Sequence, residues 1–108
     1  MQRSFDVEIR PNRDRVVVVP CGDLDCATVD RLDAAVDELV AAGWESIVVD
    51  LRGLSFMDST GLRAIVRQAN RRDATVRLID GAPRVARLFD LTGVRQLLAF
   101  VQPDAPAR

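Results

Sequence analysis

Residues 46–62 read SIVVDLRGLSFMDSTGL, and this stretch decides the fold class. Its first part, Ser46–Leu51, is a short apolar run rich in β-branched residues, which is typical of a buried, central parallel strand. From Ser59 to about Arg71 the apolar residues recur at helical spacing, and the predicted buried stripe consists of Leu62, Ile65, Val66 and Ala69. A buried strand followed by an amphipathic helix predicts an α/β sheet.

The residues before this stretch predict a hairpin and a first helix. Phe5–Arg10 alternates apolar and polar residues as a half-buried edge strand does, and Arg15–Pro20 contains four consecutive valines. Turn-forming residues 11–14 separate the two strands. Thr28 is then suited to cap a helix that runs to about Ala42, with Gly43 ending it.

The residues after it predict a strand, a third helix and a short closing segment. Thr75–Ile79 is the strand, Pro83 fits the first turn of the helix, Gly93 lies beyond its end, and Leu97–Val101 suits either strand or helix. The order β-β-α-β-α-β-α-β predicts one α/β domain over residues 1–108. We expect a mixed sheet of four to five strands, helices mainly on one face, and a frayed tail at 102–108.

Composition excludes several classes of function. The net charge is −1 and all 15 basic residues are arginine, so no bulk field favours nucleic acid or an anionic membrane. No apolar stretch is long enough to span a membrane, and the first residues do not resemble a secretory signal, which predicts a cytoplasmic protein. The sequence has no histidine and two cysteines, Cys21 and Cys26, which we interpret as small apolar residues near a loop. We therefore expect no metal, no cofactor and no catalytic residues.

The start of the second predicted helix is the candidate site. The first amides of a helix lack partners within it and the dipole is positive there, so a phosphate on Ser59 would meet donors that point towards it. Gly61 weakens the helix, which suggests that another group approaches closely. The residues alone leave a second interpretation open, since Asp58, Ser59 and Thr60 are also ordinary capping residues.

Three segments resemble the signatures of STAS domains, specifically the anti-sigma factor antagonists. They are Val48–Leu62, the loop Gly22–Asp25 and the segment Leu88–Val94. The resemblance implies that Ser59 is phosphorylated by a partner anti-sigma factor that is also a serine kinase. It further implies that the unphosphorylated form binds this partner and frees a sigma factor, and that a phosphatase resets the phosphorylated form. Such a protein is a substrate and binding partner, not an enzyme.

The expected partner-binding residues surround Ser59 in this interpretation: Asp23, Asp25, Met57, Asp58, Thr60, Gly61 and Leu62. Asp58 would orient the hydroxyl or a partner-bound metal, or only begin the helix. Asp23 and Asp25 would dock the partner, or only form a turn. Leu62 is expected to be a core residue rather than a partner contact.

The sequence also leaves three other functions to consider. A STAS accessory subunit of a lipid-transport or stress-signalling complex would use the same surface without phosphorylation. A hydrolase that uses Ser59 and Asp58 lacks an evident base and oxyanion partner. The third function is nucleic-acid binding through the arginines of the second predicted helix. A solvent-exposed helix face beside many acidic residues explains these arginines better. They are Arg63, Arg67, Arg71 and Arg72.

Overall fold

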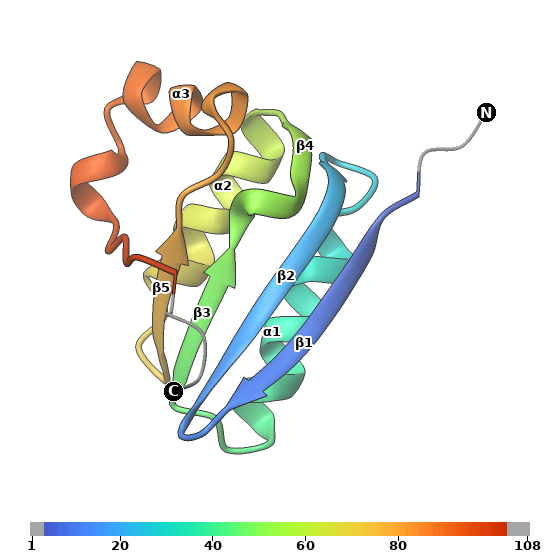
Figure 1. Ribbon diagram of the computed structural model, residues 1–108, viewed down its shortest axis with the longest axis vertical. Helices are drawn as coiled ribbons and strands as arrows, with labels where there is room; N and C mark the ends of the chain where they lie inside the picture. Colours follow the sequence, from blue (N-terminus) through green and yellow to red (C-terminus); the bar gives the residue numbers. More distant parts are fainter. Residues whose placement is uncertain (1–3, 104–108) are drawn as a thin grey trace.

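The computed structural model describes residues 4–103 and has a mixed α/β fold, as expected (Figure 1). Its helices are α1 (Val29–Ala41), α2 (Ser59–Ala69) and α3 (Pro83–Thr92), with single 3₁₀ turns at Leu51–Gly53 and Arg95–Leu97. Its strands are β1 (Asp6–Asn12), β2 (Arg15–Leu24), β3 (Ser46–Asp50), β4 (Leu54–Met57) and β5 (Thr75–Ile79). The predicted tail lies mostly in residues 104–108, outside the described residues.

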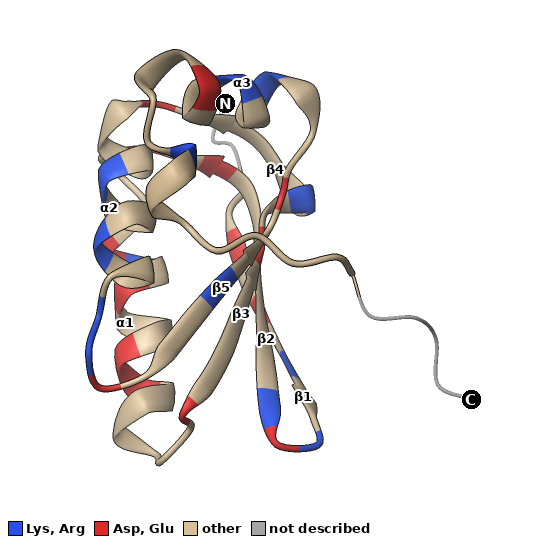
Figure 2. Ribbon diagram, turned by 90° about the vertical axis from the view of Figure 1, so that its left-hand side faces the viewer, with Lys and Arg blue, Asp and Glu red and all other residues tan. Residues whose placement is uncertain are grey.

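The sheet is mixed and has five strands, with the order β1-β2-β3-β5 and with β4 paired to the far end of β2. The predicted hairpin is confirmed, because β1 and β2 pair antiparallel, while β2 pairs parallel with both β3 and β4. Helices α1 and α2 lie side by side on one face, and α3 lies near the carboxyl ends of the strands (Figure 2). The expectation of helices mainly on one face is therefore confirmed.

The core lies between the sheet and the helices α1 and α2. Val18, Val49 and Leu78 come from the three neighbouring parallel strands β2, β3 and β5 and are fully buried against Leu32 of α1 and Ile65 of α2. Alternate residues of the same strands point to the other face. The chain after the second 3₁₀ turn crosses that face, where Val101 and Gln102 lie beside Val48 and Ile79.

Strand β2 is longer than predicted. The predicted strand ended at Pro20, and a proline has no N–H to donate to a ladder. In the structure β2 pairs with β3 through Val16–Val18 and with β4 only from Gly22 onward. Pro20 lies between these two ladders, so its missing N–H leaves no strand partner unsatisfied.

Strand β4 was not predicted, and the predicted closing element is much smaller than a strand or helix. β4 has only four residues, too few to show a period. At the other end of the chain, the segment Leu97–Val101 makes a single parallel bridge at Phe100 to Leu78 of β5. The Leu78 N–H donates to Ala99 O at 2.9 Å, and the Val101 N–H donates to Leu78 O at 2.8 Å.

The helix ends agree with the sequence in part. Gly43 and Gly93 adopt the positive φ angles, 104° and 73°, that made glycine suitable after α1 and α3. Thr28 precedes α1 but makes no side-chain cap, so that expectation was wrong. Gln68 is not part of the predicted apolar stripe of the second helix, yet it is only 5% exposed. Its amide donates to Asp33 of α1 at 2.8 Å, which explains how a polar residue is buried there.

Within residues 4–103, no helix has the length and apolar character of a membrane span.

Candidate phosphorylation site and docking surface

Ser59 is the first residue of α2 and is exposed. Only Asp58 separates it from the end of β4, so it lies near the carboxyl end of a parallel strand and at the amino end of a helix (Figure 1). Loops at this end of parallel strands are the usual place for sites in α/β proteins. The Ser59 side chain is therefore open to a modifying enzyme.

Asp58 caps α2 through its side chain. Its backbone is extended, and Oδ1 accepts a hydrogen bond from the Gly61 N–H at 2.9 Å. The Asp58 carbonyl also accepts from the Leu62 N–H at 2.9 Å. The interpretation of Asp58 as a helix-start acid is thus confirmed. One of the first helix amides, that of Gly61, is already engaged by this carboxylate, so fewer donors remain for a phosphate on Ser59 than the sequence alone suggested.

Gly61 lies against the end of β2. A Cβ atom on Gly61 would lie 2.5 Å from the carbonyl oxygen of Leu24 and 2.8 Å from Cγ of Met57. The Asp58 N–H also donates to Leu24 O at 3.3 Å. The close approach that the glycine suggested is therefore made by the protein itself, and it joins the start of α2 to the loop that follows β2.

Asp23 lies near the end of β2 and Asp25 begins the loop that follows it, and the sequence placed both beside Ser59. Asp25 Oδ1 accepts from the Ala27 N–H at 2.9 Å, so its turn-forming role is confirmed. The Thr28 hydroxyl donates to Asp23 O at 2.7 Å and accepts from the Asp25 N–H at 3.0 Å. Asp25 is half-buried, whereas Asp23 is only 8% exposed. The structure thus offers Asp25 to a partner more readily than Asp23.

Three predicted partner contacts lie beneath the surface. Met57 and Leu62 are 3% and 6% exposed and belong to the core, and Gly61 is also buried. The preference for Leu62 as a core residue is confirmed, and direct contact by Met57 is contradicted. Met57 ends β4 opposite Leu24 of β2, which turns its side chain inward. Thr60 is half-buried, so it remains a candidate contact.

Phe56 is an exposed residue at this site that sequence reasoning missed. It lies on β4 and is 41% exposed, and the neighbouring Ser55 is exposed too. Helix α3 packs against β4 and carries Leu91, which is 75% exposed. Large exposed apolar side chains near a candidate docking surface suit a protein partner. The sequence did not point to Phe56 as an exposed strand residue, because β4 itself was not predicted.

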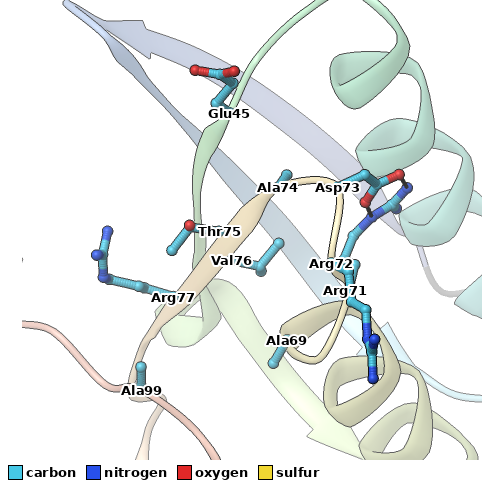
Figure 3. Close-up of a pocket in the computed structure, with 10 residues that line it drawn as sticks. All are labelled: Glu45, Ala69, Arg71, Arg72, Asp73, Ala74, Thr75, Val76, Arg77 and Ala99. Atoms are coloured by element: carbon cyan, nitrogen blue, oxygen red, sulfur yellow. Dashed lines mark hydrogen bonds and ion pairs between the residues drawn. The ribbon is translucent and has the colours of Figure 1, made fainter.

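Two of the four arginines in and just after α2 are paired with acids, in line with the interpretation of a solvated face. Arg67 pairs with Asp33, and Arg71 pairs with both Asp37 and Asp73. These hydrogen bonds with two acids raise the pKa of Arg71 above its usual value. A hollow of about 570 Å³ lies beside this end of α2 and the start of β5, and Figure 3 shows Arg71 bonded to Asp73 at its margin. It contains none of the predicted site residues.

The two cysteines are free thiols in different surroundings. Cys21 is half-buried, and burial together with the charge of Glu8 raises the pKa of its thiol. Cys26 is exposed and lies in the loop between β2 and α1, in agreement with the predicted position near a loop. No cluster of three or more His, Cys, Asp or Glu suited to a metal ion occurs in the described part of the chain.

The chain matches the family model of the STAS domain over residues 4–104. It belongs to the STAS family. The relatives include a protein of Staphylococcus epidermidis named anti-sigma-B factor antagonist, 31% identical over 98 residues, which cover 88% of this chain and 91% of that protein. A protein of the same name from Staphylococcus aureus is 34% identical over 80 residues, or 71% of this chain and 74% of that one.

Solved structures show the same STAS fold. An anti-sigma factor antagonist from Mycobacterium paratuberculosis superposes with a TM-score of 0.81 at 22% identity, covering 94% of this chain and 87% of that one. SpoIIAA in its unphosphorylated form gives 0.69 at 24% identity, covering 94% of this chain and 89% of that one. The phosphorylated form of SpoIIAA, described as a Bacillus cell fate determinant, gives 0.64 at 23%, covering 94% and 92%.

Proposed function

We propose that this STAS protein is an anti-sigma factor antagonist whose binding to an anti-sigma factor is switched off by phosphorylation of Ser59. The observation that carries the proposal is the exposed Ser59 hydroxyl at the start of α2, on a surface whose floor is rigidly packed. The names of the relatives support the antagonist role. The expected partners are an anti-sigma factor with serine kinase activity and a phosphatase, and the expected compartment is the cytoplasm.

The switch follows from electrostatics at one point. Phosphorylation adds about −1.5 to −2 charges. Asp58 precedes Ser59 directly, and its carboxylate already occupies the Gly61 N–H. A dianion on Ser59 therefore gains less from the helix start than it would at an uncapped helix, and it adds to the charge of Asp58 and the half-buried Asp25. A partner that packs closely over this surface would meet both the added charge and the added volume.

The same geometry argues against catalysis. A serine nucleophile needs a base that takes its proton. Asp58, the acidic residue adjacent to Ser59 in the sequence, uses its Oδ1 to cap the helix. The chain has no histidine that could replace it. The protein is therefore proposed to be a substrate and ligand of other proteins, with no reaction of its own.

A phosphate-transfer assay with the purified anti-sigma factor and labelled ATP tests the acceptor. We expect wild type to incorporate about one phosphate per chain, Ser59→Ala none, and the matched control Thr60→Val an amount similar to wild type. Stoichiometric labelling of Ser59→Ala would refute the assignment.

A pull-down tests the switch separately. Ser59→Ala should retain the ATP-binding anti-sigma factor and Ser59→Glu should lose it. Equal recovery by both variants, together with native protein that never carries phosphate on Ser59, would favour the accessory-subunit function instead.

A further inference from the structure

Among the described residues, no strand pairs with the outer edge of β1. In the sheet order β1 is terminal, and within residues 4–103 its only strand partner is β2 (Figure 1). The opposite edge differs, because Leu78 of β5 bonds to the chain at Ala99 and Val101. Open edges are templates for further strands, so proteins usually blunt them with charges or proline.

The register of the hairpin shows which groups point outward. Asn12 and Arg15 close a two-residue loop, in which Arg13 has a φ of 64°, and such a closing pair exchanges hydrogen bonds. Bonded and non-bonded pairs alternate from there. The non-bonded pairs are then Pro11–Val16, Ile9–Val18 and Val7–Pro20, which agrees with the lack of an N–H on both prolines. Val7 and Ile9 therefore direct N–H and C=O outward, and Pro11 directs only C=O.

The side chains of β1 form a self-complementary pattern about Ile9. Glu8 and Arg10 flank it and share one face of the sheet, because they pair with Val19 and Val17. Ile9 points to the other face and is 41% exposed, although its neighbour Val18 is fully buried. Within one chain, Arg10 Nη2 already pairs with Glu8 Oε2 at 2.7 Å, and both side chains are more than half exposed.

We propose that β1 is a dimerisation edge, at which two copies of this chain pair antiparallel about a two-fold axis at Ile9. In this register each Ile9 N–H donates to the opposing Ile9 carbonyl, and each Val7 N–H donates to the opposing Pro11 carbonyl. Glu8 lies opposite Arg10 of the second copy, so opposite charges meet on both sides of the axis. The two Ile9 side chains lie on the same face at the axis and cover one another.

The charges on this edge favour this pairing over the neighbouring register. A shift that centres the axis on Glu8 places the two Glu8 carboxylates opposite each other, which is destabilising. A strand from another protein with a different charge pattern would not place opposite charges opposite Glu8 and Arg10. Ser59 lies beyond the far end of β2, so the dimer does not depend on the function proposed for the phosphorylation site.

A charge-swap experiment tests the dimer with substitutions at exposed positions, which leave the core intact. Glu8→Arg places arginine opposite arginine, and Arg10→Glu places glutamate opposite glutamate. By sedimentation equilibrium at low salt, wild type should self-associate in the high micromolar range, and each variant should associate about tenfold more weakly. An equimolar mixture of the two variants should restore association, because every cross-pair is again of opposite charge. Circular dichroism melts serve as the folding control.

Three results would overturn the proposal. They are a wild type that stays monomeric to its solubility limit, single variants that associate as wild type does, and a mixture that associates no better than its components. A single variant could lose association because it is less stable, which a lowered melting temperature would show. The double variant, which combines Glu8→Arg and Arg10→Glu, distinguishes this case from a loss of charge pairing. That chain restores opposite charges within its own dimer and should associate like wild type.

Discussion

Gly61 and Leu24 pack so closely that a methyl group on Gly61 would lie 2.5 Å from the Leu24 carbonyl oxygen. Gly61 belongs to the first turn of α2, and Leu24 ends β2, so the contact fixes the helix start against the acidic loop. The position of Ser59 relative to Asp25 is thus set by backbone packing. A rigid frame allows a single phosphate to alter binding without a large rearrangement.

Gly61→Ala should destabilise the protein, although alanine is the better helix former by about 1 kcal/mol. The added methyl must displace backbone at Leu24, and overpacking of this kind costs about 1–3 kcal/mol. Urea unfolding would measure the change. The matched control is Ser59→Ala in the same turn, where the side chain is exposed and the change should stay within about 0.5 kcal/mol. A Gly61→Ala protein more stable than wild type would contradict the packing argument.

Asp58→Ala should lower the free energy of unfolding by about 1 kcal/mol, because the Gly61 N–H loses its capping oxygen. Asp58→Asn keeps a capping oxygen and should remain close to wild type in stability. Both substitutions remove the same negative charge, so their difference isolates the cap. Thermal unfolding at neutral pH provides the comparison, and equal losses in the two variants would show that Asp58 does not act as a cap.

Asp50 gives the protein a pH-dependent contribution to stability. Burial alone would raise the pKa of its carboxyl, but the hydrogen bonds and charge of Arg52 outweigh burial and hold the pKa below its usual value. Arg52 Nη2 lies 2.7 Å from Asp50 Oδ2, and Asp50 is 4% exposed. Because the folded pKa lies below the unfolded one, the stabilisation is present above the unfolded value, about 3.9, and is lost as pH falls through the folded pKa.

Asp50→Asn should therefore cost about 1–2 kcal/mol at neutral pH, and the cost should shrink as the pH is lowered below about 4. Urea unfolding of both proteins across this range measures it. Glu8→Gln is the control, since its pair with Arg10 is exposed and should contribute little. A difference between wild type and Asp50→Asn that stays constant with pH would refute the role of the charge.

The strongly patterned elements of the fold were predictable from the sequence. The valine run, the apolar stripes of α1 and α2, and the glycine after α3 each predicted an element that the structure contains. β4 escaped because four residues with adjacent exposed Ser55 and Phe56 show no alternation. The end of β2 escaped because Pro20 lies between two successive partners, which only the sheet order reveals.

The position of the candidate site was predictable from the sequence, but which of its residues are buried and which are exposed was not. The segment resemblance directed attention to Ser59, which the structure shows to be exposed. A glycine and a methionine beside it looked like contact residues, yet Gly61 and Met57 form the floor under the surface. Spacing along a chain does not show which side of a strand end faces the core. For the same reason exposed Phe56 was not recognised as a docking candidate.

The most direct test of the account is the affinity of the anti-sigma factor for two forms of this protein. One form is unmodified, and the other carries phosphoserine incorporated at position 59 during synthesis. Isothermal titration at physiological salt should give a dissociation constant at least about tenfold weaker for the phosphorylated form, a change of about 1.4 kcal/mol. Equal affinities for the two forms, with both shown to be folded, would contradict the proposal that Ser59 is the switch.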